Sequence, residues 1–362
     1  MKPIPRFSGR LLLCTALGMA VSAIAHANDA LQRCAAIRDN DARLQCYDAL
    51  AARTAASPPP ANPATSGNSA QTQQVASDTL NNSPRRSYLT RAWNLDGRAG
   101  RNHPGRMSPL RPYRQSYLIV RASNSPNTTP HSPAAGHAVT TPQSLDSAEA
   151  KFQFSFKSEI MHYHEIDWLG FRSFRLWGAY TQQSNWQAFN TRNSSPFRET
   201  NYEPELIATF GTGKQDGLKL VNLGIEHQSN GQSLPQSRSW NRIYLQGGWE
   251  WNDNLSLLAR GWWRIPENPQ QDDNPDILNY IGRADAVLRW APDGEQVVSL
   301  LLRNNLNLGH NRGFAQIDWT TPIKLGDSAK LFVQYTNGFG ESLIDYNYQQ
   351  QTLGLGIAFR DW

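Results

Sequence analysis

The feature that most restricts the fold of this chain is a regular alternation of bulky apolar residues with small or polar ones. Phe152, Phe154 and Phe156 alternate with polar residues, and residues 353–359 alternate Leu, Leu, Ile and Phe with Gly, Gly and Ala. In a strand, residues two apart share a face. Each such run would therefore have one apolar face and one small or polar face, which is typical of a barrel strand with lipid outside.

Runs of this kind recur along most of the chain, and their even number fits a single-chain outer-membrane barrel. We therefore predict an all-β protein, a twelve-stranded antiparallel transmembrane β-barrel. The content of 12 Trp, 12 Tyr and 13 Phe agrees with this fold. The predicted strands lie near residues 117–123, 149–161, 172–186, 202–212, 218–229, 240–251, 255–265, 279–290, 296–308, 313–323, 329–340 and 350–361.

The N-terminus predicts export from the cytoplasm. Lys2, Arg6 and Arg10 flank a short apolar stretch, and Ala-His-Ala at residues 25–27 offers a cleavage point. This pattern is that of a secretory signal peptide, which we assign to residues 1–27. No apolar run of about 18 residues follows it, so a transmembrane helix is not expected.

Two further regions are indicated between the signal and the barrel. Residues 28–56, rich in Ala, Leu, Arg and Asp, predict a short α-helical hairpin. Residues 57–86, rich in Pro, Ser, Asn and Gln, predict a disordered linker. Cys34 and Cys46 predict one disulfide, because an exported chain with two cysteines most simply pairs them. The barrel domain is then residues 87–362. The sequence leaves open whether the hairpin binds peptidoglycan, a periplasmic partner or nothing.

The charge of the chain does not indicate a nucleic-acid partner. The whole sequence has 35 Lys and Arg against 30 Asp and Glu, and three of the basic residues lie in the predicted signal. The exported part is therefore nearly neutral, and we expect no binding to nucleic acid.

One predicted strand places polar side chains where its pattern requires apolar ones. Val221, Leu223, Ile225, His227 and Ser229 share one face, and the first three put that face toward lipid. Polar groups that face a membrane are costly and are by default candidates for function. His227 and Ser229 are therefore candidate site residues.

The next predicted strand repeats this anomaly. Asn241 shares a face with Ile243 and follows His227 across a loop of about a dozen residues, so the two strands are expected to be hairpin neighbours. Asn241 could then lie beside His227. Ser229 would act as nucleophile, His227 as base and Asn241 as the group that orients the imidazole. A neutral amide suits this place, because a carboxylate facing hydrocarbon would cost more to bury.

Alternatives remain open on these residues alone, because His-x-Ser is a common pattern. The sequence has no G-x-S-x-G, H-E-x-x-H or G-x-x-x-x-G-K motif, which argues against an α/β-hydrolase, a zinc protease and a P-loop protein. His162 and His164, near Glu165, are interpreted as strand-end residues, with metal binding as the less favoured role. A non-catalytic porin or adhesin barrel is the alternative function. It gives no reason for His227 and Ser229 to face lipid.

Four segments resemble one known family. Residues 227–231 with 237–241 are similar to the active-site hairpin of outer-membrane phospholipase A. The segments 194–204, 272–276 and 340–347 match the same family in order. The resemblance covers roughly residues 88–362 and excludes the predicted hairpin and linker. It implies a barrel of the cell outer membrane that hydrolyses acyl esters of phospholipids and lysophospholipids toward the outer leaflet.

The resemblance also implies roles for single residues. Ser229 would be the nucleophile, His227 the base and Asn241 its partner, and the amide of Gly231 would contribute to the oxyanion hole. The family requires Ca²⁺ and is activated by forming a homodimer.

The implied calcium ligands are oxygen atoms, which suit this hard cation. They are the carbonyl of Gln232, the hydroxyls of Ser194 and Ser237, and the carboxylate of Asp273, directly or through water. In the family the counterpart of Ser194 comes from the other subunit. Gln232 replaces a basic residue, which leaves a carbonyl ligand unaffected.

Two further positions bear on the dimer and on calcium. Gln182 shares the lipid-facing parity of its strand, and the resemblance implies that it hydrogen-bonds across the homodimer. A rim position at the strand end is the alternative for Gln182. Leu234 stands where the family often has an acid, so calcium binding is expected to be weaker there.

Overall fold

The computed structural model describes residues 37, 39, 42–43, 45–46, 48, 86–97, 108–252, 254–323 and 329–360, without the side chains of residues 165 and 360. The chain divides into two compact units, residues 1–83 and 84–362, and each is described by itself. The predicted signal peptide and linker lie outside the described residues, the last residue of the linker excepted. In the first unit Cys46 is disulfide-bonded. Its expected partner, Cys34, lies outside the described residues.

The second unit is nearly all strand. A short helix, α4 (Tyr88–Ala92), precedes a two-residue strand, β1 (Arg111–Pro112), and two 3-10 turns are η1 (Thr191–Asn193) and η2 (Ile277–Asn279). None of the described helices is long and apolar enough to cross a membrane. The long strands are β2 (Ser116–Ser123), β3 (Ala148–Trp168), β4 (Phe171–Trp186), β5 (Phe197–Gly211), β6 (Gly217–Ser229), β7 (Ser239–Trp251), β8 (Leu255–Arg264), β9 (Ala284–Trp290), β10 (Val297–Asn304), β11 (Gly313–Pro322), β12 (Lys330–Phe339) and β13 (Gln349–Arg360).

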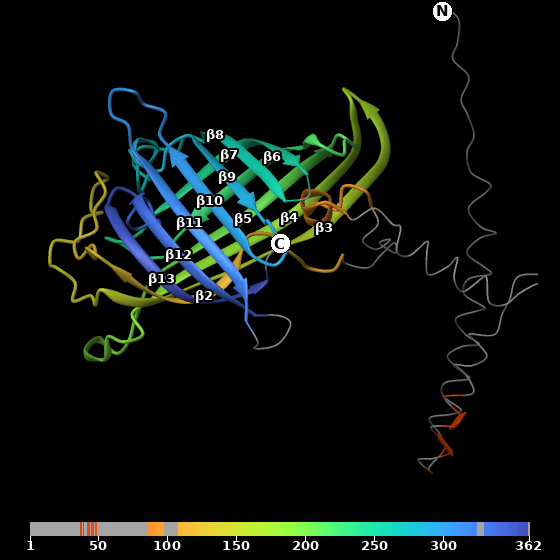
Figure 1. Cartoon of the computed structure of the whole chain (residues 1–362). Coiled ribbons are helices and arrows are strands. Elements are labelled where there is room, and N and C mark those ends of the chain that lie inside the picture. Colours follow the sequence, from red (N-terminus) through yellow and green to blue (C-terminus); the bar gives the residue numbers. More distant parts are fainter. Residues whose placement is uncertain are drawn as a thin grey trace, which may run out of the picture. The chain divides into compact units, whose positions relative to one another are not determined.

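The long strands form a closed antiparallel barrel (Figure 1). Each strand from β2 to β13 pairs with the next along the chain, and β13 pairs with β2 to complete the circle. The short β1 pairs with β3 beside this ring. The predicted twelve-stranded barrel is therefore confirmed for the part of the chain that the structure describes.

Some strand ends differ from the predicted ones. β3 runs to Trp168, because β3 and β4 continue to pair with each other as far as Trp168 and Phe171. Phe171 and Trp168 both contact the ring of Phe210 on β5. β9 begins at Ala284 rather than near residue 279, because η2 occupies the preceding residues.

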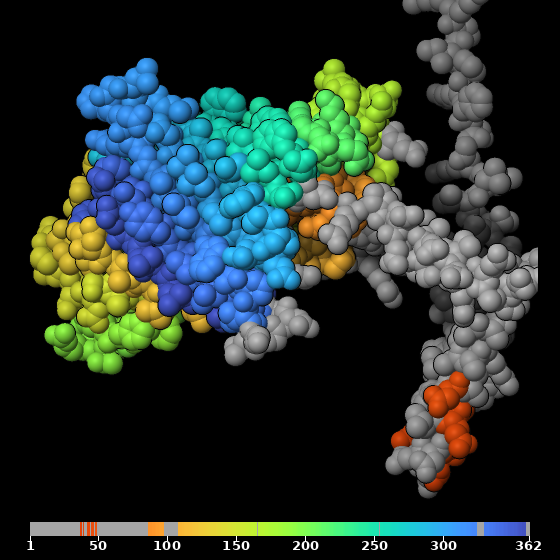
Figure 2. All heavy atoms as spheres, viewed as in Figure 1, coloured from red at the N-terminus to blue at the C-terminus, as the bar shows by residue number. Residues whose placement is uncertain are grey.

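The two faces of the wall differ in chemistry. Leu118, Val120, Leu353 and Leu355 on neighbouring strands are exposed outside, and Figure 2 shows one side of this outer wall. Inside, buried charged residues pair with one another, and Arg260 Nη2 lies 2.7 Å from Asp285 Oδ2. Apolar residues outside and paired polar residues inside are the distribution expected for a barrel in lipid.

Residues 86–97 pack against inward-facing side chains of the barrel. Leu89 is fully buried, and its amide donates to Glu250 Oε1 at 3.0 Å. Trp93 packs edge-on against Trp177, and the Lys157 ammonium lies 3.2 Å from the centre of the Trp93 indole. Residues 87–97 fall within the predicted barrel domain, but no helix was predicted there.

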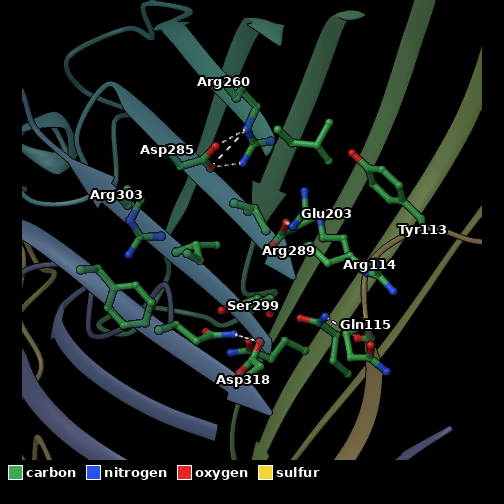
Figure 3. Close-up of a pocket in the computed structure, with 18 of the residues that line it drawn as sticks. Tyr113, Arg114, Gln115, Glu203, Arg260, Asp285, Arg289, Ser299, Arg303 and Asp318 are labelled. Atoms are coloured by element: carbon green, nitrogen blue, oxygen red, sulfur yellow. Dashed lines mark hydrogen bonds and ion pairs between the residues drawn. The ribbon is translucent and has the colours of Figure 1, made fainter. Parts of the chain in front are cut away.

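An internal cavity of about 300 Å³ remains beside this segment. Figure 3 shows its lining, in which Arg114, Arg260 and Arg303 lie among carboxylates and amides from several strands. The dashed contacts between Arg260 and Asp285 mark an ion pair between the neighbouring strands β8 and β9 in its wall. The cavity is therefore lined by charged side chains together with apolar ones such as Leu258, Val287 and Phe314.

Candidate active site

The hairpin of β6 and β7 brings His227 and Asn241 into contact and places Ser229 on the same face. Along β6, Leu223 and Ile225 are 49% and 47% exposed, whereas their neighbours Asn222 and Glu226 are buried. This alternation puts His227 and the following candidate on the outer face. In the register of the hairpin, His227 lies opposite Asn241, and Ser229 lies opposite Ser239.

His227 and Asn241 are joined by a hydrogen bond. His227 Nδ1 lies 2.9 Å from Asn241 Oδ1. Because an amide oxygen only accepts, Nδ1 must carry the proton and donate. The other ring nitrogen of neutral His227, Nε2, is then the one with a free electron pair, as a general base requires.

Ser229 ends β6, two residues beyond His227 on the same face. Its side chain is half-buried, and its hydroxyl makes no hydrogen bond to any described residue. Its register partner on the neighbouring strand β5 is Tyr202. The strand therefore holds the hydroxyl and the imidazole on one side of the sheet.

The loop after β6 is tied by one buried side chain. Asn230 Nδ2 donates to the carbonyl of Gln236 at 2.8 Å, and Asn230 Oδ1 accepts from the amides of Arg238 at 2.9 Å and Gln232 at 3.3 Å. Gly231 has a φ of +60°, in the left-handed region that favours glycine. A Cβ at Gly231 would lie 3.1 Å from the ring of Tyr202.

Two of the four candidate calcium ligands are in direct contact. Ser237 Oγ donates to Asp273 Oδ2 at 2.6 Å, and Ser239 Oγ lies 3.4 Å from the same oxygen. His137, from the loop between β2 and β3, places Nε2 3.0 Å from Asp273 Oδ1. This oxygen-rich cluster lies at the same end of the barrel as the loop between β6 and β7.

The other two candidates do not contact this cluster within one chain. Gln232 lies in the loop between β6 and β7, and its amide is bonded to Asn230. Ser194 lies in the loop between β4 and β5, is exposed and has a left-handed backbone with φ +60°. Because β4 and β6 run in the same direction, both loops lie at one end of the barrel.

Gln182 lies on the outer face of β4. Its Oε1 accepts a hydrogen bond from the Tyr180 hydroxyl at 3.0 Å, and its register neighbours are Phe154 and Tyr202. Gln182 is therefore a polar group within an aromatic part of the outer wall.

Two other groups of possible metal ligands have structural partners. His162 Nδ1 lies 2.7 Å from Glu159 Oε1, and Arg175 also bonds Glu159, near the opposite end of the barrel. Inside the barrel three carboxylates come close together, but arginines pair with them, as Arg114 does with Glu205 at 2.7 Å. These three carboxylates are Glu203, Glu205 and Glu226.

Sequence reasoning missed Glu267 and His137. Glu267 Oε1 accepts from Asn241 Nδ2 at 3.0 Å. Burial is the main cause that raises the pKa of the Glu267 carboxyl above its ordinary value. Both residues come from loops, where no periodicity indicates which side chains meet, so no pattern in the sequence could have found them.

The fold and the placement of these residues define a class of protein. It is a β-barrel of the outer membrane that carries a Ser, a hydrogen-bonded His–Asn pair and an oxygen-rich loop cluster on or beside its outer wall. Barrels of this class differ from pores in that the candidate chemistry faces lipid rather than the lumen.

Comparisons with known proteins name the family. The model of the phospholipase A1 family matches residues 89–359. A putative phospholipase A1 of Neisseria meningitidis is 35% identical and aligns over 97% of this chain and 96% of its own length.

Solved structures of similar proteins belong to the same family. The Salmonella typhi outer-membrane phospholipase, a dimer with bound calcium, is 33% identical, covers 76% of this chain and 98% of its own, and has a TM-score of 0.61. The Escherichia coli outer-membrane phospholipase A, solved with an active-site asparagine replaced by alanine, is 31% identical, covers 76% and 99%, and also has a TM-score of 0.61.

The chain belongs to the phospholipase A1 family of outer-membrane phospholipases. It is thus a phospholipase, a lipid hydrolase of the cell outer membrane.

Proposed function

We propose that this chain cleaves acyl ester bonds of phospholipids and lysophospholipids with Ser229 as nucleophile, His227 as base and Asn241 as the orienting residue. The observation that carries the proposal is the 2.9 Å hydrogen bond between His227 Nδ1 and Asn241 Oδ1 on the outer wall, beside Ser229. His227 is held in one tautomer on the same strand face as Ser229, two residues away, and it activates the serine when the hydroxyl turns to hydrogen-bond Nε2.

The reaction has two halves. In the first, His227 Nε2 takes the proton of Ser229 Oγ while that oxygen attacks the ester carbonyl. The protonated imidazole then gives its proton to the departing alcohol, the rest of the lipid, and leaves an acyl-serine. In the second, water attacks the acyl-serine with His227 again as base, which releases the fatty acid and restores Ser229.

The negative oxygen of each tetrahedral intermediate needs a donor. We assign this to the backbone amide of Gly231, two residues after Ser229. The left-handed turn at Gly231 and three hydrogen bonds between the Asn230 side chain and the backbone around this loop support a fixed direction for this amide.

Calcium fits the donors beside the site. The Ser237 hydroxyl and the Asp273 carboxylate lie within 2.6 Å of each other, and hydroxyl, carbonyl and carboxylate oxygens are what Ca²⁺ prefers. We propose that Asp273, Ser237 and the Gln232 carbonyl hold it. When bound, calcium would supply positive charge near the developing oxyanion.

We propose further that two copies of the chain complete this site. Ser194 is exposed in a neighbouring loop and contacts none of the other proposed ligands in its own chain. Supplied by a second copy, its hydroxyl would add one oxygen ligand. Gln182, on the outer wall, would then form part of the contact between copies. The Salmonella typhi relative, a dimer with bound calcium, supports this reading.

The proposal is tested by fatty-acid release from phospholipid in mixed micelles. Ser229→Ala should reduce release to background while the barrel keeps its heat-modifiable gel mobility. Ser299→Ala, a serine that lines the internal cavity, is the matched control and should retain full activity. Turnover by Ser229→Ala at the rate of the parent chain would overturn the mechanism.

A further inference from the structure

Glu267 contacts Asn241 on the side of the amide that faces away from His227. It belongs to the loop that follows β8, and the amide of Ile265 donates to the backbone carbonyl of Asn241 at 2.8 Å, which brings the start of this loop against β7. Two residues later Glu267 Oε1 accepts from Asn241 Nδ2 at 3.0 Å. Asn241 therefore uses both ends of its amide, one for His227 and one for Glu267.

The two ends of an amide are not equivalent. An ionised carboxylate only accepts hydrogen bonds, so Glu267 can bond the NH₂ end of Asn241 and not the oxygen. Asn241 Oδ1 is then left to face His227, where it can only accept. This forces the proton of the imidazole onto Nδ1 and leaves Nε2 free to take a proton. Without Glu267 the amide could turn over and present its NH₂ group to His227, which would favour the wrong tautomer.

We infer that Glu267 is a positioning residue for ester hydrolysis, one that fixes the orientation of the Asn241 amide and through it the tautomer of His227. This inference rests on the proposed Ser229–His227–Asn241 mechanism. It adds a carboxylate to a site whose nearest orienting group is neutral. The carboxylate stands in the loop after β8 rather than on the strands that carry His227 and Asn241.

A purely structural role is the rival explanation. Glu267 Oε2 lies 3.7 Å from Arg264 Nη2, and the same guanidinium bonds Asp272 at 2.6 Å and the carbonyl of Asn274 at 3.2 Å. Glu267 could thus act by supporting the loop that carries Asp273. The two roles predict different kinetics. Loss of positioning lowers kcat at any calcium concentration, whereas loss of support raises the calcium requirement.

The test uses the full exported chain in detergent, with lysophospholipid as substrate and saturating calcium. Glu267→Ala should lower kcat about tenfold, with KM and the calcium requirement unchanged within about twofold, because a charge-assisted hydrogen bond is lost. In an Asn241→Ala background the same change should have almost no further effect, since the path through Asn241 is already broken.

Arg264→Met separates the two roles. It removes the ion pair with Glu267 and keeps the bond from Asn241, so it should raise the calcium requirement and leave kcat at saturating calcium within about twofold of the parent. If Glu267→Ala does not assemble, Glu267→Gln decides. It keeps the size of the side chain but adds an NH₂ donor beside the remaining oxygen, so the Asn241 amide is no longer held in one orientation and kcat at saturating calcium should fall.

Three results would overturn the inference. The first is full kcat in Glu267→Ala. The second is a tenfold fall in kcat when Glu267→Ala is added to Asn241→Ala. The third is activity of Glu267→Ala that excess calcium restores. For Glu267→Gln, full kcat at saturating calcium would do the same. These results bear on Glu267 only if Ser229→Ala is inactive. If Ser229→Ala hydrolyses lipid, the proposed mechanism itself has failed, and that failure is seen separately.

Discussion

At the scale of single residues, the outer wall of β6 and β7 combines two opposing demands. Leu223, Ile225 and Ile243 are exposed apolar side chains of the kind that lipid requires. His227 and Asn241 follow on the same faces and satisfy each other by a hydrogen bond, which reduces the cost of placing polar groups there. Their mutual bond leaves only the side of His227 that serves Ser229 open for chemistry.

The roles of His227 and Asn241 predict unequal losses. His227→Ala should reduce fatty-acid release to the background of Ser229→Ala, because it removes the proposed base for the serine proton. Asn241→Ala should retain measurable turnover, with kcat lowered about 100-fold, because it orients the base without itself transferring a proton. Initial rates at saturating lysophospholipid measure both. Equal residual rates for the two variants would contradict the assignment.

At the scale of elements, the turn after β6 places the proposed oxyanion donor. Gly231→Ala should lower kcat with the barrel still assembled, because φ +60° is strained for alanine by about 1 kcal/mol and the new Cβ would press on Tyr202 at 3.1 Å. Gly294→Ala is the matched control. That glycine has φ +75° in the turn between β9 and β10, and a Cβ there would meet nothing within 4 Å.

Gel mobility with and without heating reports assembly of both variants, and fatty-acid release reports their activity. Gly294→Ala should carry the same backbone strain with full turnover. Equal activity in the two variants would show that the direction of the Gly231 amide does not matter for hydrolysis.

The strands were predictable, and part of the site was not. A membrane imposes alternation on every strand, so β6 and β7 and the shared face of His227 and Asn241 follow from period two. The loops have no such constraint. His137 and Glu267 reach the site from loops outside the β6–β7 hairpin, and their contacts depend on backbone turns without a repeating pattern. The extension of β3 to Trp168 depends on its continued pairing with β4, which local alternation does not indicate.

At the scale of the whole molecule, calcium and self-association should be linked. If Ser194 of one copy completes the site of another, calcium must stabilise the dimer by the same free energy by which the dimer favours calcium. Chelator should therefore stop hydrolysis and shift sedimentation in detergent toward monomer. Ser194→Ala and Asp273→Ala should each raise the calcium requirement. Full activity in a calcium-free monomer would contradict this arrangement.

Gln182 provides a second test of the dimer. Gln182→Ala should weaken self-association measured by sedimentation, because an outward polar group would lose its partner in the second copy. Activity of covalently cross-linked dimers should change much less, since Gln182 touches none of the catalytic candidates. An unchanged association constant would remove Gln182 from the contact.

The N-terminal region should be dispensable for the barrel. None of the proposed site residues lies in residues 28–83, so deletion of residues 28–83 should leave assembly and hydrolysis intact. Deletion through residue 97 should destabilise the barrel, because it removes Leu89 and Trp93 from the interior. Thermal unfolding followed by gel mobility compares the two deletions. Equal stability would mean that residues 86–97 contribute nothing to the fold.

The central claim is that Ser229 is the nucleophile, and the most direct measurement is to identify the residue that reacts covalently. A serine-reactive fluorophosphonate with a long alkyl chain is added to the assembled protein in detergent with calcium, and labelled peptides are mapped by mass spectrometry. We predict one label per chain, on Ser229, and none in His227→Ala. A protein that hydrolyses phospholipid while Ser229 stays unlabelled and another residue reacts would contradict the account.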